Sequence, residues 1–290
     1  MAQLEIRKLD APYGAEVLGL DPTTAPDDDT STVLSRAFYE HGVLLFPELE
    51  FDFAEQQRLA ETLVGWGPDQ WTETEKGSPG NYISNREENA TSATGKIQYH
   101  TDGMWSDEPF NLVSLYAMEV APDAAPTMMA SMANGWDLLP ADLKARVAEL
   151  HVVQGEGHYI VPDGEEIEEY SKAEHEGGHS RVTPLAMPHP KTGRTLLYIT
   201  EQQTRGIVEL PDAEGRELLQ ELYGHLYSSA NVMQHTWTNK EFVAWDNIAV
   251  QHARPNVSYD GPARTLRRST VPPGWMWAQR WYNPSAAASA

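Results

Sequence analysis

The hydrophobic positions of this chain recur in two periods. Where apolar and polar residues alternate, or a short apolar run stands between turn residues, the pattern is typical of a β-strand, because successive side chains of a strand point to opposite faces. We therefore expect strands over 4–9, within 12–22, and over 42–47, 82–83, 110–120, 127–131, 195–199, 242–245 and 265–271.

Apolar residues at helical spacing predict helices over 31–40, 52–63, 136–150 and 212–227. Cap-type residues precede the first of them at 27–30, and Asp212 is the expected cap of the last. Strands and helices do not alternate regularly, and long connections separate the strands. The sequence therefore predicts a mainly β protein with helices (α+β), built on a jelly-roll or double-stranded β-helix core that helices flank.

The length of the chain suits one large domain, which we expect over 1–282, followed by a low-complexity tail over 283–290. The least regular part is 155–184, where most charged residues are acidic. A long solvated segment inside a compact domain predicts a lid-type insertion, although the sequence leaves open whether this segment is ordered.

Composition removes several classes of protein. The chain has no cysteine, which excludes disulfides, zinc–thiolate sites, iron–sulfur clusters and cysteine nucleophiles. A formal net charge of −22 disfavours a nucleic acid partner, because phosphate backbones are bound by clustered Lys and Arg. Apolar runs of membrane-spanning or signal-peptide length are missing, so we expect a cytoplasmic protein with no membrane partner. Whether it forms a homo-oligomer stays open.

Candidate chemistry begins at His100 and Asp102. In an extended segment, side chains two residues apart point to the same face, so this pair could offer a ring nitrogen and a carboxylate oxygen to one metal ion. The His-x-Asp pattern alone occurs often by chance, but His252 supplies a second histidine far downstream. Two histidines and one carboxylate on one face of Fe(II) leave open positions for a bidentate cosubstrate and for dioxygen.

Two arginines on the last predicted strand are candidate anion ligands. Arg264 and Arg268 lie four positions apart and should point to the same face, whereas Arg267 should face away. An arginine can hold a carboxylate through two charge-assisted hydrogen bonds, and the hydroxyl of Thr127 could add a donor. A lone arginine in so acidic a chain is more often part of a surface ion pair. The position of these two shortly after His252 favours an anion site.

A set of short motifs covers nearly the whole chain. They are Gly14-Ala-Glu-Val-x-Gly-Leu-Asp21, Gly42-Val-Leu-Leu-Phe-Pro47, His100-Thr-Asp102-Gly, Thr127 after a Pro-containing turn, Pro188-His-Pro-x-Thr-Gly-Arg194-x-x-Leu-Tyr198, Trp245-Asp-Asn-x-x-x-x-His252 and Arg264-x-x-x-Arg268-x-Thr270. In the order and separation of these motifs the chain resembles the TauD/TfdA family of Fe(II)- and 2-oxoglutarate-dependent dioxygenases.

The resemblance implies a cupin-like jelly-roll core, with Fe(II) held by His100, Asp102 and His252, and with 2-oxoglutarate and O2 as cosubstrates. It implies that Arg268 binds the far carboxylate of 2-oxoglutarate, with Thr127 as its hydroxyl partner. Arg264 matches a second arginine near the cosubstrate or a substrate anion. One departure is the turn before Thr127, which reads Ala-Ala-Pro where the family usually has Gly-Gly-Asp.

The implied reaction oxidatively decarboxylates 2-oxoglutarate to succinate and CO2 and oxidises a C–H bond of a small molecule, which we expect to be anionic or derived from an amino acid. Hydroxylation is the usual outcome. The presence of Asp102 disfavours halogenation, because related halogenases carry a small residue there. Two alternatives stay open: desaturation or ring closure in natural-product biosynthesis, and a non-catalytic cupin-like protein that binds a metal or small molecule.

The sequence defines the residues that contact the substrate less well than the metal ligands. Candidate substrate contacts are Asn81, Tyr82, Asn85, Lys96 and Trp105, which precede or follow the His-x-Asp motif. A separate segment, His175-Glu-Gly-Gly-His179, fits the zinc-protease signature. That signature needs a helix, which two adjacent glycines destabilise, so we interpret the segment as part of the acidic insertion.

Overall fold

The structure is a computed structural model that describes residues 4–50, 52–65, 82–88, 90–156 and 179–272. Its helices are α1 (Asp28–His41), α2 (Phe53–Val64), α3 (Met132–Leu138), α4 (Ala141–Val147) and α5 (Asp212–Leu226). Its strands are β1 (Glu5–Lys8), β2 (Ala15–Leu18), β3 (Val43–Phe46), β4 (Tyr82–Ser84), β5 (Gly95–His100), β6 (Leu112–Val120), β7 (Thr127–Ser131), β8 (His151–Gly155), β9 (Ser180–Pro184), β10 (Ala186–Pro188), β11 (Thr195–Leu197), β12 (Thr204–Ile207), β13 (Val232–His235), β14 (Phe242–Asp246), β15 (Val250–Val257) and β16 (Arg264–Val271). None of the described helices is long and apolar enough to cross a membrane.

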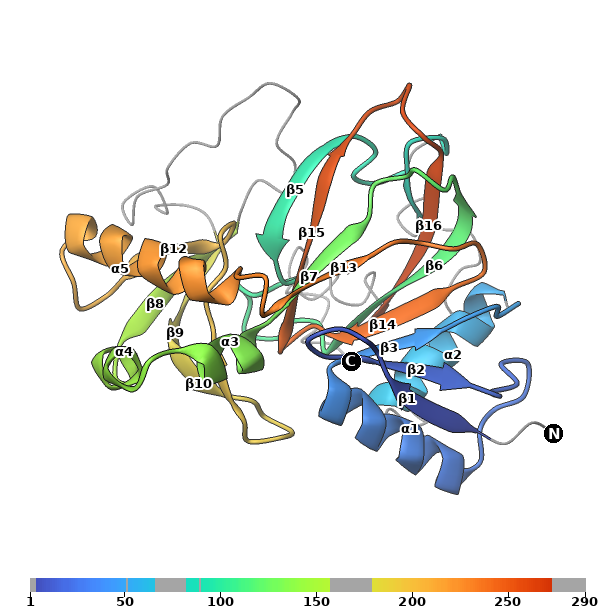
Figure 1. The fold of residues 1–290 in the computed structure, drawn as a ribbon, viewed down its shortest axis with the longest axis horizontal. Coiled ribbons are helices and arrows are strands. Elements are labelled where there is room, and N and C mark those ends of the chain that lie inside the picture. Colours follow the sequence, from blue (N-terminus) through green and yellow to red (C-terminus); the bar gives the residue numbers. More distant parts are fainter. Residues whose placement is uncertain (1–3, 51, 66–81, 89, 157–178, 273–290) are drawn as a thin grey trace, which may run out of the picture.

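Two sheets form the centre of the molecule. Within the described residues, the major sheet has the strand order β1-β2-β3-β14-β6-β16-β4, and the minor sheet has the order β13-β7-β15-β5. Strands that are far apart in the sequence are neighbours in both sheets, such as β3 with β14 and β5 with β15 (Figure 1). This long-range antiparallel pairing confirms the predicted jelly roll.

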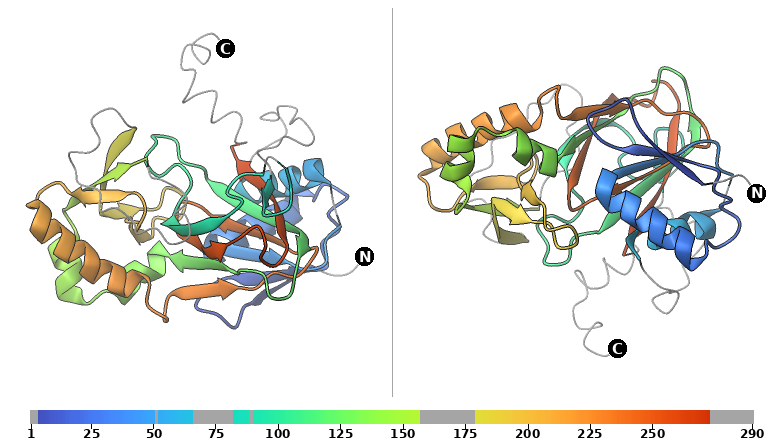
Figure 2. Two further views of the ribbon diagram at one scale, coloured as in Figure 1. Left: turned by 90° about the horizontal axis from the view of Figure 1, so that it is seen from above. Right: turned by 60° about the horizontal axis from the view of Figure 1, so that its bottom comes forward.

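The strand β3 explains how the sheets and helices are layered. Val43 and Leu45 point into the core between the two sheets, whereas Leu44 and Phe46 point into a second core beneath α1 and α2. Because successive side chains alternate, a continuous apolar run is buried on both faces of the major sheet. The helices α1 and α2 therefore cover its outer face (Figure 2).

Local signals at the helix ends agree with the sequence. The side chain of Asp27 accepts a hydrogen bond from the backbone of Thr30 at the start of α1. Asp52 and Glu55 form a capping box at the start of α2. At the other end of α1, Gly42 takes a left-handed φ of 72°, which lets the chain turn directly into β3.

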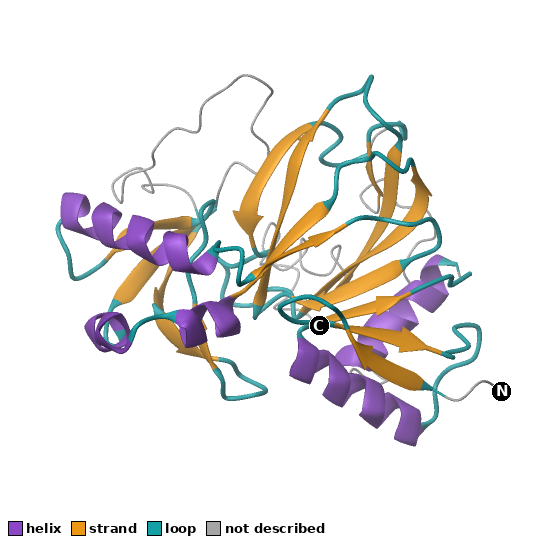
Figure 3. Cartoon of the chain, in the orientation of Figure 1, coloured by secondary structure: helices purple, strands orange, loops and turns teal. Residues whose placement is uncertain are grey.

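A side lobe contains α3, α4, α5 and the short strands β8 to β12, packed around an apolar cluster of its own (Figure 3). In this lobe β8 pairs with β9 in antiparallel register, which brings the two ends of the acidic insertion together. The regular strand β9 occupies 180–184, so the prediction of irregular structure was wrong at that end. Most of the predicted insertion, 157–178, and the predicted tail over 283–290 lie outside the described residues.

Two helix predictions need correction. The single helix expected over 136–150 is in fact two short helices, α3 and α4, with Pro140 between them. Proline lacks a backbone N–H and disfavours helical geometry in the residue before it, which ends α3 at that point. Asp212 is the first residue of α5, not its cap: Pro211 occupies the cap position and makes no side-chain cap hydrogen bond.

Candidate metal centre

The two candidate histidines are direct neighbours across two antiparallel strands. In the pairing of β15 with β5, His252 stands opposite His100. Residues that are directly opposite each other in an antiparallel pair point to the same face of the sheet. Their rings are consequently close, with centroids 4.1 Å apart. One strand pairing therefore brings together two histidines that lie far apart in the sequence.

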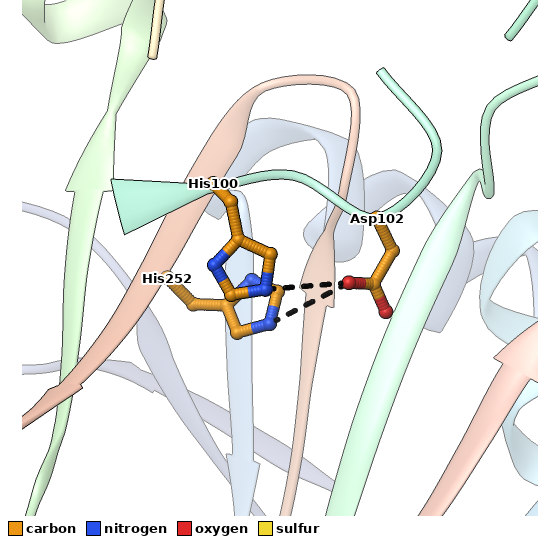
Figure 4. A group of neighbouring side chains, drawn as sticks. All are labelled: His100, Asp102 and His252. Atoms are coloured by element: carbon orange, nitrogen blue, oxygen red, sulfur yellow. Dashed lines mark ion pairs between the residues drawn. The ribbon is translucent and has the colours of Figure 1, made fainter. Parts of the chain in front are cut away.

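Asp102 lies beyond the end of β5, in a turn. The expectation that His100 and Asp102 share a face of one extended segment was therefore wrong, although the two side chains do meet. The Nε2 atoms of His100 and His252 lie 3.4 Å and 3.9 Å from Oδ1 of Asp102 (Figure 4). All three residues have a ligating atom within 4.8 Å of the others, a spacing that one metal ion can bridge.

The tautomer of His100 suits metal binding. Its Nδ1 lies 2.8 Å from the carbonyl oxygen of Gln98, which only a protonated nitrogen can satisfy. The lone pair of the ring is then on Nε2, the nitrogen that faces Asp102. An imidazole whose other nitrogen donates to a carbonyl is the usual arrangement in metal sites.

Electrostatics at the centre favour the ligating protonation states. Burial, together with the neighbouring His100, holds the pKa of His252 well below its usual value, so this imidazole is neutral. Burial alone would raise the pKa of Asp102, but the guanidinium of Arg268 and the adjacent His100 and His252 hold it well below its usual range. Imidazole nitrogens beside an ionised carboxylate are the donor set that fits Fe(II).

Arg268 contacts the carboxylate from the other side. Its Nη2 forms an ion pair with Oδ2 of Asp102, while Oδ1 of Asp102 faces the histidines. The guanidinium also lies over the ring of Phe110, 5.5 Å from its centroid. The side chain of Arg268 remains 23% exposed, so one edge of this cation is open to a further partner.

Thr127 contacts Arg264, and not Arg268 as the family resemblance implied. Nη2 of Arg264 donates to Oγ1 of Thr127 over 3.1 Å. Four strand residues span roughly 13 Å, so Arg264 at the start of β16 reaches the start of β7, whereas Arg268 lies in the middle of β16. Nε of Arg264 donates to the carbonyl oxygen of Ala125 over 2.9 Å. The unusual Ala-Ala-Pro turn thus still places Thr127 beside an arginine.

Arg264 is a buried cation with unused capacity. Among the described residues, its Nη1 has no hydrogen-bond partner and no acidic side chain forms an ion pair with it. Burial, and then the nearby Arg254, lower its pKa to about 9. A buried guanidinium held this way is stabilised by an anion that brings its own oxygen atoms.

Comparison with known proteins agrees with this geometry. The family model described as taurine catabolism dioxygenase TauD, TfdA family matches residues 5–270. The chain belongs to this family. It is an α-ketoglutarate (2-oxoglutarate)-dependent dioxygenase, an oxidoreductase whose His–Asp–His site fits Fe(II).

Individual relatives cover much of the chain. An (S)-phenoxypropionate/alpha-ketoglutarate-dioxygenase of Sphingobium herbicidovorans is 31% identical over 265 residues, which is 86% of this chain and 88% of that protein. A pentalenolactone F synthase of Streptomyces arenae is 35% identical over 96 residues, 33% of this chain and 31% of that protein. The crystal structure of AAD-2 with Mn(II) and N-oxalylglycine superposes with a TM-score of 0.73 at 24% identity, covering 93% of this chain and 97% of that one. This superposition confirms the TauD-type fold.

The register of β16 agrees with the sequence prediction for Arg267. Its Nε donates to Oε1 of Gln56 on α2 over 2.6 Å, and its guanidinium lies over the ring of Tyr116. Arg267 therefore faces the helices, on the opposite side of the major sheet from the metal centre. Tyr82 stands opposite Arg267 in the pairing of β4 with β16, so Tyr82 also points to that outer face.

The other candidate substrate residues have structural partners or lie apart. The side chain of Asn85 accepts from the backbone N–H of Arg264 and donates to two carbonyl groups of the loop after β15. Lys96 is exposed near the start of β5, and Asn81 lies outside the described residues. Trp105 is buried and stacks on His179, with ring centroids 5.2 Å apart.

That stacking also bears on the zinc-protease pattern. His179 directly precedes the extended strand β9, and His175 lies outside the described residues. Within the part of the chain that the structure describes, the group that could hold a metal ion is His100, Asp102 and His252.

Sequence reasoning missed two residues that contact the metal-binding loop, Gln203 and Asn247. Asn247 belongs to the Trp245-Asp-Asn motif, which was noted for its position and not for a role. Gln203 has no signal in the sequence: it stands in a connection between short strands, and only tertiary structure places it beside Thr101.

Proposed function

We propose that this TauD/TfdA-family protein hydroxylates a C–H bond of a small anionic molecule, with Fe(II) bound by His100, Asp102 and His252. The observation that carries the proposal is the approach of three ligating atoms to within 4.8 Å, at a site where the pKa values of His252 and Asp102 are both held well below their usual values. When bound, the iron supplies dioxygen activation, which couples decarboxylation of 2-oxoglutarate to succinate and CO2 with oxidation of the substrate.

For the cosubstrate, we assign the far carboxylate of 2-oxoglutarate to Arg264 and Thr127. The support is the buried guanidinium with its unpartnered Nη1 and its contact with the Thr127 hydroxyl. Trp237 donates through Nε1 to the same hydroxyl oxygen over 3.0 Å, so Thr127 already accepts two N–H groups and its own O–H is left to donate. An incoming carboxylate would receive that O–H and the free Nη1.

For the substrate, we assign its anionic group to the open edge of Arg268. This arginine borders the metal centre, is partly exposed and packs on an aromatic ring, which together suit an anion attached to an apolar body. In a protein with a net charge of −22, a cation at the centre is needed to attract such a ligand. The relative that acts on (S)-phenoxypropionate handles a molecule of this kind, an aromatic carboxylate.

Asp102 also bears on the outcome of the reaction. Its Oδ1 faces the two histidines and its Oδ2 is held by Arg268, so the carboxylate is oriented to contribute one oxygen to the metal. A carboxylate in this position occupies the place that a halide would need. This favours oxygenation over halogenation.

A second outcome within the same chemistry is desaturation or ring closure. A pentalenolactone F synthase is similar over a third of the chain, which is the reason for keeping a biosynthetic outcome as the second candidate. The mass of the product separates the outcomes: hydroxylation adds one oxygen atom to the substrate, whereas desaturation removes two hydrogen atoms.

The experiment that tests the proposal measures succinate formed from 2-oxoglutarate with Fe(II) under air, during a screen of small carboxylates and sulfonates for stimulated oxygen uptake. We expect wild-type turnover, and its loss in His100→Ala and Asp102→Ala. The control is His225→Ala, which changes a histidine on α5 in the side lobe. Full succinate production by the first two variants would place the metal elsewhere. Metal binding without any succinate formation would favour the non-catalytic alternative.

A further inference from the structure

The loop that carries Asp102 has no strand partner of its own. β5 ends at His100, and Thr101 and Asp102 follow in a turn that is nonetheless almost completely buried. Buried backbone N–H and C=O groups that lack hydrogen-bond partners destabilise a fold. Something other than a β-ladder must therefore satisfy the backbone here.

The side chain of Gln203 forms hydrogen bonds with both the N–H and the carbonyl group of Thr101. The Thr101 N–H donates to Oε1 of Gln203 over 3.2 Å, and Nε2 of Gln203 donates to the Thr101 carbonyl oxygen over 2.8 Å. A single side-chain amide thus binds the donor and the acceptor of one residue. Only Gln and Asn offer an acceptor and a donor at this fixed spacing without a charge.

Asn247 does the same for the metal ligand itself. The Asp102 N–H donates to Oδ1 of Asn247 over 3.0 Å, and Nδ2 of Asn247 donates to the Asp102 carbonyl oxygen over 2.9 Å. The second N–H of this amide donates to the carbonyl oxygen of Phe110 over 2.9 Å. Two consecutive residues of the loop are therefore each held by one carboxamide.

Both carboxamides are themselves held in place. Gln203 is fully buried. Its backbone N–H donates to the hydroxyl of Thr200, and that hydroxyl donates to Oε1 of Gln203. Asn247 is also buried, and it follows Asp246, whose Oδ2 lies 2.9 Å from Nε2 of the buried His189. Nδ1 of His189 accepts two backbone N–H groups, so the proton of this ring is on Nε2, the nitrogen next to Asp246.

We propose that Gln203 and Asn247 are positioning residues: together they form a double amide clamp that sets the Asp102 carboxylate against His100 and His252. The inference rests on the proposed metal site. The clamp joins two parts of the fold, because Gln203 comes from the side lobe, just before β12, whereas Asn247 follows β14 of the major sheet. The adjacent Gln202 adds to the same contact by donating its backbone N–H to the Tyr99 carbonyl oxygen over 3.2 Å.

Through this clamp the side lobe contributes to metal affinity without supplying a ligand. Groups that orient metal ligands through hydrogen bonds typically change metal affinity by about 10–100-fold when they are removed. The expected effect of losing one carboxamide is therefore a rise of about 10-fold or more in the dissociation constant for the metal.

The test is anaerobic calorimetric titration of the purified full-length protein with Mn(II) alone. The variants are Gln203→Met and Asn247→Leu, which keep volume and charge while removing the amide. Their matched controls are Gln154→Met and Asn231→Leu, which remove equally buried amides that bind other parts of the backbone. Urea unfolding of all four variants without metal gives the cost to stability separately.

We expect the first pair to weaken Mn(II) binding by about 10-fold or more, while the controls stay within about twofold of wild type at a similar loss of stability. Should either clamp variant fail to fold, Gln203→Asn or Asn247→Ser takes its place and should show the same loss. Unchanged affinity in folded clamp variants, or equal losses in the controls, would overturn the clamp. Separately, if wild type fails to bind Mn(II), or His252→Ala still binds it, the proposed metal site itself is wrong and the clamp with it.

Discussion

Replacing Arg264 by alanine should reduce 2-oxoglutarate binding far more than replacing Arg268. In the proposed complex Nη1 of Arg264 donates a charge-assisted hydrogen bond to the far carboxylate while Nη2 holds the Thr127 hydroxyl beside it. A hydrogen bond to a charged group contributes about 1.5–3 kcal/mol, so its loss at the upper end is about 3 kcal/mol. At 25 °C this corresponds to a rise of roughly 100-fold in the dissociation constant.

The assay is anaerobic titration of the Mn(II)-loaded protein with 2-oxoglutarate. Arg267→Ala is the control on the same strand, because its side chain faces α2. If Arg264→Ala leaves a destabilised protein, Arg264→Lys keeps the charge but loses the two-pronged geometry and should weaken binding by about 10-fold. The reasoning is refuted if folded, metal-loaded Arg264→Ala binds 2-oxoglutarate within threefold of wild type, or if Arg268→Ala weakens it more.

Three further predictions concern single residues. Thr127→Val should raise the 2-oxoglutarate dissociation constant about fivefold, through loss of one hydroxyl donor worth about 1 kcal/mol, with Mn(II) affinity unchanged in the same titrations. Arg267→Ala should lower the free energy of unfolding by about 1–3 kcal/mol in urea, because Gln56 loses a buried partner; an unchanged midpoint would contradict that. Burial raises the pKa of Glu61, so the folded state prefers its neutral form. That preference stabilises the fold at pH values below the pKa of Glu61 in the unfolded chain, and the stabilisation is lost as the pH rises through its pKa in the folded protein. The free energy of unfolding of Glu61→Gln should therefore rise relative to that of wild type from acid to neutral pH. A pH-independent difference would contradict this prediction.

Much of the fold could be predicted from local patterns in the sequence. The run at Val43 to Phe46 is apolar at every position, and it is buried on both faces of the major sheet. Helices α1 and α2 begin at the acidic caps Asp27 and Asp52, and the predicted starts at 31 and 52 lie within one turn of the observed ones at 28 and 53. The break at Pro140 was also visible in the sequence, but the apolar spacing on either side of it was given more weight.

The parts that could not be predicted depend on contacts between distant segments. Asp102 reaches the histidines by a turn, and the side chains that hold this turn come from residues 203 and 247. Likewise, alternation along β16 correctly placed Arg264 and Arg268 on one face and Arg267 on the other. It could not say which arginine lies beside Thr127, because that depends on how the two sheets align along their length.

A crystal structure of the protein with Mn(II) and N-oxalylglycine, an analogue of 2-oxoglutarate, tests the central claim most directly. We predict a single metal ion in contact with His100, Asp102 and His252, and the far carboxylate of the analogue on Arg264 and Thr127. A metal ion bound elsewhere, or a far carboxylate bound by Arg268 with Arg264 left unpaired, would contradict the account.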